Sequence, residues 1–137
     1  PDARADVPRD PRAEGGVMSR EDIYREIDTE RGRQDAKWGE QNHPMVGKAA
    51  RRGLTTPHDE AARLLLPSAG AAREFCNHQH RTEQGTYTSI AVEELAEFVE
   101  ACVLHGEASD EAREELVQTA AVLVAMIECI DRKRCTR

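Results

Sequence analysis

Glutamates at helical spacing are the residues best suited to chemistry in this sequence. Glu93, Glu97 and Glu100 fall within one sector of a helix at about 100° per residue. Glu94 lies beside that sector, and the opposite side of the helix is apolar. A row of carboxylates on one helix face is also typical of a surface that only contacts water. This helix alone therefore leaves two interpretations open, a metal site and a solvated face.

Glu115 lies in the next helical stretch and favours the metal site. The run from Ala120 to Ile127 is apolar on every face, so we expect protein to surround it. Glu115 projects in the same direction as Val122 and Met126, which predicts a carboxylate that is at least half buried. Burial of a carboxylate is costly unless the group is paired or bound to a metal.

A short connection at 106–108 should make the two helices antiparallel and bring Glu115 within reach of Glu94 and Glu97. Three converging carboxylates, with no Lys or Arg expected beside them, repel one another and raise one another's pKa. A divalent cation removes that conflict, and all-oxygen ligation favours Mg²⁺ or Mn²⁺ over Zn²⁺. Because Mg²⁺ in such sites also binds substrate phosphates, we expect metal-assisted hydrolysis of a phosphorylated substrate.

Two helical motifs and a loop segment occur together in this sequence. The first motif is I-x-x-E-E-x-x-E at 90–97, and the second is E-E-L-V-Q at 114–118, followed by an apolar helix. These motifs resemble those of the MazG-like all-α nucleoside triphosphate pyrophosphohydrolases, and the segment from Glu30 to His43 is similar to the opening of small phage and actinobacterial members. The family implies that an NTP or dNTP is converted to the monophosphate and pyrophosphate, with a preference for purine deoxynucleotides such as dGTP. It also implies a homodimer or homotetramer.

The same resemblance assigns roles to individual residues. Glu94, Glu97 and Glu115 become metal ligands, and Glu93 orients the attacking water or ligates a second ion. Gln118 stands where the family usually has Asp, and its amide oxygen can ligate a metal but carries no charge.

The departure at Gln118 leaves alternatives open. Glu93 or Glu114 could supply the missing carboxylate, or one metal is held more weakly. A second function, from a different class, is a non-catalytic helical module that binds nucleotide or a partner and has lost the family's full metal site.

Candidate substrate-binding residues lie mainly between the first helix and the next. Trp38 could stack on a base while Arg33 and Lys37 reach phosphates. A purely structural role, in which Trp38 packs its own loop against the rest of the fold, explains this residue at least as well. Asn42 could read a base or ribose edge, but a turn-forming Asn-His-Pro needs no ligand to explain it.

Helices must position these residues, and the composition favours helices throughout. Aromatic residues make up 4% of the chain, and the β-branched and aromatic clusters typical of strands are almost missing. We expect helices at about 20–32, 57–66, 69–82, 87–105 and 109–133, with a long loop from Gly32 to Pro57. The expected start signals are Ser19 with Asp22, Thr56 with Pro57, Thr88 or Ser89, and Ser109. The expected fold is all-α, of the four-helix-bundle type, completed by oligomerisation.

Length and charge set the remaining expectations. The 137 residues suffice for one domain, predicted at 18–137 after a flexible tail at 1–17 that is rich in Pro, Gly and charge. Lys133 and Arg134 favour the C-terminal dipole of the last helix, and the family resemblance adds them as triphosphate contacts. A net charge of −7 argues against a nucleic acid polymer as partner. Because no apolar run approaches the length of a membrane span, we expect no membrane partner and a cytoplasmic protein.

Overall fold

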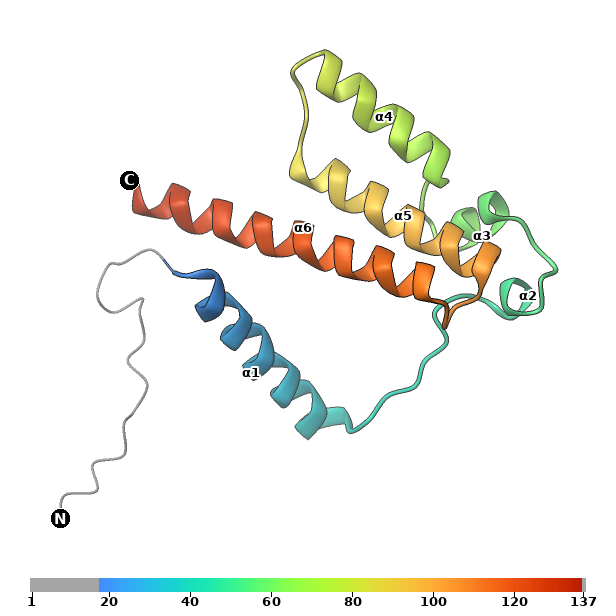
Figure 1. Ribbon diagram of the computed structural model, residues 1–137, viewed down its shortest axis with the longest axis horizontal. Helices are drawn as coiled ribbons and strands as arrows, with labels where there is room; N and C mark the ends of the chain where they lie inside the picture. The colour runs from blue at the N-terminus through green and yellow to red at the C-terminus, as the bar shows by residue number, and fades with distance from the viewer. Residues whose placement is uncertain (1–17, 137) are drawn as a thin grey trace. The chain divides into compact units, whose positions relative to one another are not determined.

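Helices account for all the regular structure in the part of the chain that the structure describes. The computed structural model describes residues 18–136, and its helices are α1 (Arg20–Trp38), α2 (Lys48–Arg51), α3 (Pro57–Arg63), α4 (Ala69–Arg81), α5 (Tyr87–His105) and α6 (Asp110–Cys135) (Figure 1). The predicted all-α class is confirmed. None of these helices combines the length and the apolar character that crossing a membrane requires. The predicted tail at 1–17 lies outside the described residues.

The chain folds as two compact units. One comprises Gln41–Leu123, with α2 to α5 and the first part of α6. The other comprises, within the described range, residues 18–40 and 124–136, that is, α1 and the last part of α6. Inside this second unit Arg20 pairs with Glu128 at 3.2 Å.

The helix starts follow side-chain caps that the sequence marks. The Ser19 hydroxyl accepts from the backbone N–H of Asp22, and the Asp22 carboxylate accepts from the N–H of Ser19, which confirms the predicted capping box. Thr56 caps α3 as predicted. The cap of α5 is Thr86, whose hydroxyl accepts from the N–H of Ser89, so the predicted cap at Thr88 or Ser89 is wrong.

The first helix continues to Trp38 rather than ending near Gly32, so the predicted loop from Gly32 to Pro57 is shorter and contains α2. A glycine inside a helix costs only about 1 kcal/mol. Ion pairs across this region favour the longer helix, with Arg31 bonded to Asp35 at 2.7 Å and Arg33 to Glu30 at 3.2 Å. Gly39 ends the helix with a positive φ of 67°.

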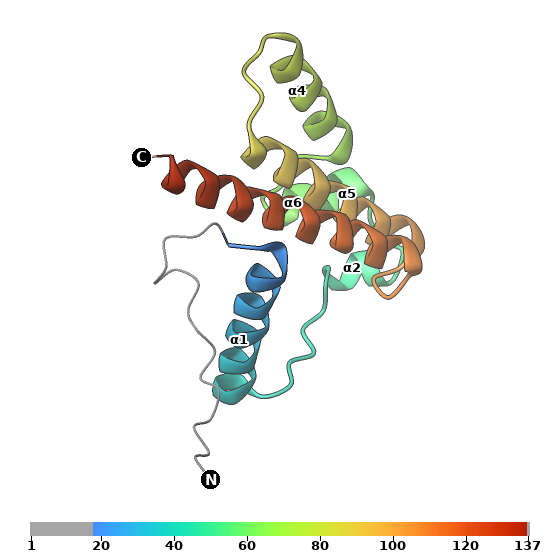
Figure 2. The same ribbon diagram turned by 60° about the vertical axis from the view of Figure 1, so that its left-hand side comes forward.

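The core of the unit at 41–123 is built around α5. Its main cluster joins residues before and within α2, in α3, in α5 and at the start of α6: Val46, Ala50, Ala61, Phe98, Val99, Ala101, Cys102 and Ala112. A second, smaller cluster joins Ala69 and Ala72 of α4 to Ala96 of α5. Small side chains at this seam let α4 approach α5 closely, and Figures 1 and 2 both show α4 running beside α5.

A buried charge ties the segment before α2 to α3. Glu60 is 1% exposed, and its carboxylate accepts from the Arg63 guanidinium at 2.7 and 3.1 Å. The backbone N–H of Gly47 donates to the same carboxylate at 2.7 Å. The hydrogen bonds from Arg63, against the opposing effect of burial, hold the pKa of Glu60 below its ordinary value. A Cβ atom at position 47 would overlap the Arg63 guanidinium, so a larger residue there would force the exposed arginine side chain to shift.

A tight turn sets the register between α5 and α6. Gly106 ends α5 with a φ of 105° and donates its N–H to the Cys102 carbonyl. The Ser109 hydroxyl donates to the Gly106 carbonyl at 2.7 Å and accepts from the N–H of Ala112 at 3.1 Å. This turn, predicted from Gly106 and Ser109, lets α6 start at Asp110, five residues before Glu115.

The predicted enclosure of Ala120–Ile127 is not provided by the described residues of the chain. Leu123 is 48% exposed and Ile127 is 37% exposed, whereas Val124 is buried. A single chain of this size supplies too few apolar partners to cover a long helix on every side.

Candidate metal centre

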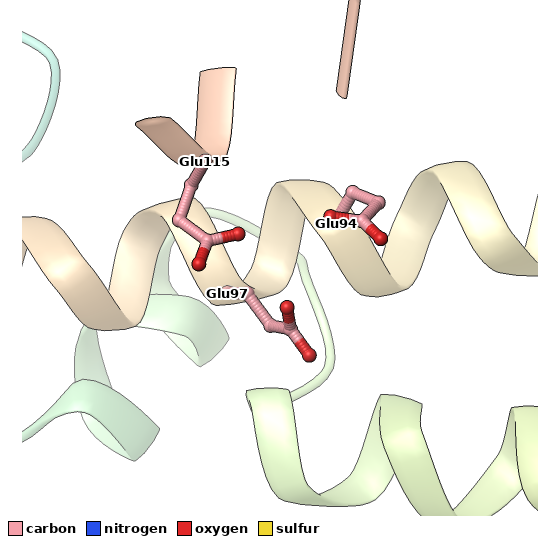
Figure 3. A group of neighbouring side chains, drawn as sticks. All are labelled: Glu94, Glu97 and Glu115. Atoms are coloured by element: carbon pink, nitrogen blue, oxygen red, sulfur yellow. The ribbon is translucent and has the colours of Figure 1, made fainter. Parts of the chain in front are cut away.

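Glu94, Glu97 and Glu115 come together in the unit at 41–123. Glu94 and Glu97 are one turn apart on α5, and Glu115 approaches them from α6 (Figure 3). One carboxylate oxygen from each residue lies within 4.8 Å of the other two. The three glutamates that the sequence analysis singled out therefore form one cluster, and metal binding by them stays a prediction.

Two of these carboxylates each have a buried oxygen without a partner. Neither Oε2 of Glu94 nor Oε2 of Glu115 accepts a hydrogen bond from any residue in the described range. Burial raises the pKa of Glu94, and the negative charges of Glu97 and Glu93 raise it further. Burial also raises the pKa of Glu115, reinforced first by Glu97 and then by Glu94. Buried, unpartnered and mutually repelling oxygens fit a hard divalent cation.

Arg73 on α4 contacts the third carboxylate. Its Nε and Nη2 atoms both donate to Oε1 of Glu97 at 3.3 Å. The expectation that no Lys or Arg lies near the cluster is therefore wrong. Arg73 directly follows Ala72, which packs in the seam between α4 and α5. The alanines at 69 and 72 are the sequence signal that could have placed Arg73 beside α5.

A hollow of about 260 Å³ adjoins the cluster. Its lining includes Glu97 and Glu115, and the other ionisable residues around it are Arg73, Glu100, His105, Glu111 and Glu114. The hollow is thus open to a small charged ligand and is strongly acidic in the protein alone. An anionic substrate could enter only together with cations.

The remaining predicted residues of the metal site lie next to the cluster but outside it. Glu93 is half buried on α5 and lies beside the Cys76 thiol of α4. Burial, with a smaller contribution from Glu93, raises the pKa of that thiol to about 11. Gln118 is exposed on α6, one turn after Glu115. The predicted roles of Glu93 and Gln118 stay predictions.

Most predicted substrate-binding residues belong to the other unit. That unit holds Arg33, Lys37 and Trp38 on α1 and Lys133 and Arg134 in the last turn of α6. Arg33 pairs with Glu30 of its own helix. The Lys37 ammonium lies 4.7 Å from the centre of the Trp38 ring.

Trp38 ends α1 and does not lie in a loop, and it is 54% exposed. It is therefore not a buried anchor within the chain. Asn42 is exposed in the segment before α2, in the same unit as the cluster. Substrate binding by these residues stays a prediction.

No family model matches the chain, and no curated protein or solved structure is similar to it. The resemblance to MazG-like proteins therefore rests on the sequence motifs at 90–97 and 114–118 and on the segment from Glu30 to His43.

Replacement of Glu115 by Gln should stabilise the metal-free protein. The raised pKa means that the folded state holds a proton on Glu115 more tightly than the unfolded chain, for which the ordinary value is 4.5. Ionised Glu115 thus lowers the free energy of unfolding at pH values above its folded pKa, and this penalty disappears below about pH 4.5. We expect a gain of about 1 kcal/mol at neutral pH, or about 3–5 °C in Tm, that vanishes on acidification.

Calorimetry of both proteins with chelator, from neutral to acidic pH, measures this effect. Addition of Mg²⁺ should reverse the order, because only the wild type keeps all three carboxylates. Equal Tm values at neutral pH without metal would show that Glu115 carries no electrostatic penalty.

Proposed function

We propose that this chain is a metal-dependent nucleoside triphosphate pyrophosphohydrolase. It would convert an NTP or dNTP, with water, to the monophosphate and pyrophosphate, acting on free cytoplasmic nucleotides rather than on a nucleic acid polymer. The observation that supports this proposal is the cluster of three carboxylate oxygens within 4.8 Å of one another, two of its members with a buried oxygen lacking a partner. The motif resemblance at 90–97 and 114–118 supplies the reaction class.

In the proposed mechanism Glu94, Glu97 and Glu115 would hold Mg²⁺ or Mn²⁺, and Gln118 would add a weaker oxygen ligand. The metal would neutralise phosphate charge and lower the pKa of the attacking water. Glu93 would orient that water or ligate a second ion. The water oxygen forms a bond to the α-phosphorus and releases a proton to the solvent, while the bond from this phosphorus to the bridging oxygen breaks and pyrophosphate leaves with the electron pair.

A substrate panel tests the proposal. The protein is incubated with each common NTP and dNTP plus Mg²⁺ or Mn²⁺, and products are resolved by chromatography. We expect monophosphate and pyrophosphate in equal amounts, with purine deoxynucleotides among the best substrates. Release of inorganic phosphate and a diphosphate would indicate a different reaction. Tight nucleotide binding without turnover would favour the non-catalytic module that Gln118 leaves open.

Replacement of Gln118 by Asp is the test specific to that position. A carboxylate there adds a charged ligand one turn from Glu115, so we expect Mn²⁺ to bind about tenfold more tightly by calorimetric titration. Gln118→Ala is the matched control and should weaken binding slightly. If neither variant changes the Mn²⁺ affinity, Gln118 does not contact the metal.

The exposed apolar residues of α6 support the predicted homo-oligomer. Within the single chain, five large apolar side chains of this helix remain at least 37% exposed: Leu116, Val117, Leu123, Ile127 and Ile130. We propose that a second copy covers them and completes a bundle of the four-helix type, as a homodimer or homotetramer. Light scattering should give twice or four times the mass of the chain, and a monomeric mass at micromolar concentration would contradict this.

A further inference from the structure

The contact between Arg73 and the acidic cluster of Glu94, Glu97 and Glu115 bears on substrate binding as well as on metal binding. Glu97 is the carboxylate of the cluster whose charge is balanced by an arginine, through two contacts of 3.3 Å. Among the described residues, the other two carboxylates, of Glu94 and Glu115, keep buried oxygens without partners. The protein's own cation thus balances the charge of one of the three carboxylates.

The charges around the hollow point to a second role for Arg73. Five carboxylates line the hollow, those of Glu97, Glu100, Glu111, Glu114 and Glu115. Arg73 is the one permanently cationic side chain among the described residues of this lining. A polyphosphate that enters the hollow therefore has one protein group with which to form charge-assisted hydrogen bonds.

We propose that Arg73 binds the substrate's phosphate chain, and that it is held on Glu97 until a divalent cation takes that carboxylate. This inference rests on the proposed function and extends it to a substrate-binding residue. Metal and Arg73 compete for Glu97. Once the metal neutralises Glu97, the guanidinium loses its partner and turns to the phosphate oxygens that enter the same hollow.

The geometry permits this exchange. The Arg73 side chain is 50% exposed, and its hydrogen bonds to described residues are those to Glu97, so this long flexible side chain can move without repacking of the core. Glu97 is 21% exposed, and in Figure 3 it extends from α5 toward α4, where Arg73 lies. A pair exposed to this extent is weak, so a divalent cation can displace it.

Arg73→Gln separates the two roles because it should change two affinities in opposite directions. Mn²⁺ alone should bind about two- to fivefold more tightly, since its competitor is gone. Inorganic tripolyphosphate, titrated with Mg²⁺ present, should bind about tenfold or more weakly, since its hydrogen-bond donor is gone. Arg73→Lys should stay close to the wild type for Mn²⁺ and lose part of the tripolyphosphate affinity.

Arg81→Gln, in the last turn of α4, is the control and should change neither affinity. If Arg73→Gln weakens the binding of both Mn²⁺ and tripolyphosphate, Arg73 has only a structural role in the site, and the proposal fails. It also fails if either affinity is unchanged, or if the wild type binds no Mn²⁺. Opposite shifts in a protein that hydrolyses no triphosphate would retain Arg73 as a polyphosphate-binding residue and overturn the pyrophosphohydrolase function instead.

Discussion

Glu97→Gln should lower kcat/KM for triphosphate hydrolysis about 1,000-fold or more while the protein stays folded. Glu97 is the central member of the cluster, because its negative charge raises the pKa of both Glu94 and Glu115. Gln is nearly the same size and removes the negative charge that a metal requires. Loss of the several kcal/mol that a bound metal contributes to the transition state corresponds to that factor.

Steady-state kinetics with Mg²⁺ should show the loss of activity, and titration with Mn²⁺ should show a loss of metal binding in the same variant. Glu74→Gln is the matched control, because Glu74 is exposed on α4 and lies outside the hollow. It should retain full activity. A Glu97→Gln protein with activity within a few-fold of the wild type would mean that the three glutamates are not the metal site.

The second large effect is expected on stability, from Glu60→Ala. This change removes the buried carboxylate, leaves the N–H of Gly47 without its acceptor and opens a void between the segment before α2 and α3. Arg63 is 55% exposed and can return to water, so the loss comes mainly from Glu60 itself. We expect about 3 kcal/mol less free energy of unfolding, or about 10 °C in Tm.

The pH dependence gives this effect a signature. The pKa of Glu60 is lower in the folded state than its ordinary value of 4.5. Its contribution to stability is therefore complete above pH 4.5 and is lost as the pH falls through the folded pKa. Urea unfolding at pH 7 and at pH 3 should show the difference between wild type and Glu60→Ala shrinking at the lower pH.

Glu60→Gln is the control for this variant. It keeps an acceptor for Gly47 but no charge for Arg63, so its loss should be smaller than that of Ala. Glu60 lies outside the hollow, and activity below the Tm should be unchanged in both variants. A loss under about 0.5 kcal/mol for Glu60→Ala would show that the buried charge is not what ties α3 to the segment before α2.

Local signals predicted the elements that carry the cluster. The bounds of α5 follow from its apolar side and from Gly106, and the cap of α6 follows from Ser109, so the convergence of Glu94, Glu97 and Glu115 could be derived from spacing. The end of α1 could not, since a glycine inside a helix costs only about 1 kcal/mol and ion pairs such as Arg31–Asp35 offset part of that cost.

Contacts between distant parts of the chain were the ones missed. Arg73 reaches Glu97 across 24 residues of sequence, and Glu60 meets Gly47 across 13. The alanines at 69 and 72 could have placed Arg73 beside α5, but no cap or helical period indicates its contact with Glu97 itself, and none indicates the contact between Glu60 and Gly47. Glutamates are mostly exposed in proteins. Glu60 is buried because the Arg63 guanidinium and the backbone N–H of Gly47 donate hydrogen bonds to its carboxylate.

The turn from Gly106 to Ser109 also limits how the length of this chain can change. Each residue inserted there would rotate the start of α6 by about 100° relative to α5 and shift it by about 1.5 Å. One insertion would carry Glu115 away from Glu94 and Glu97, whereas the connection at 82–86, between α4 and α5, has exposed residues and could lengthen with less consequence. Proteins that share this site should therefore vary in length at 82–86 and keep the distance from Glu97 to Glu115 fixed.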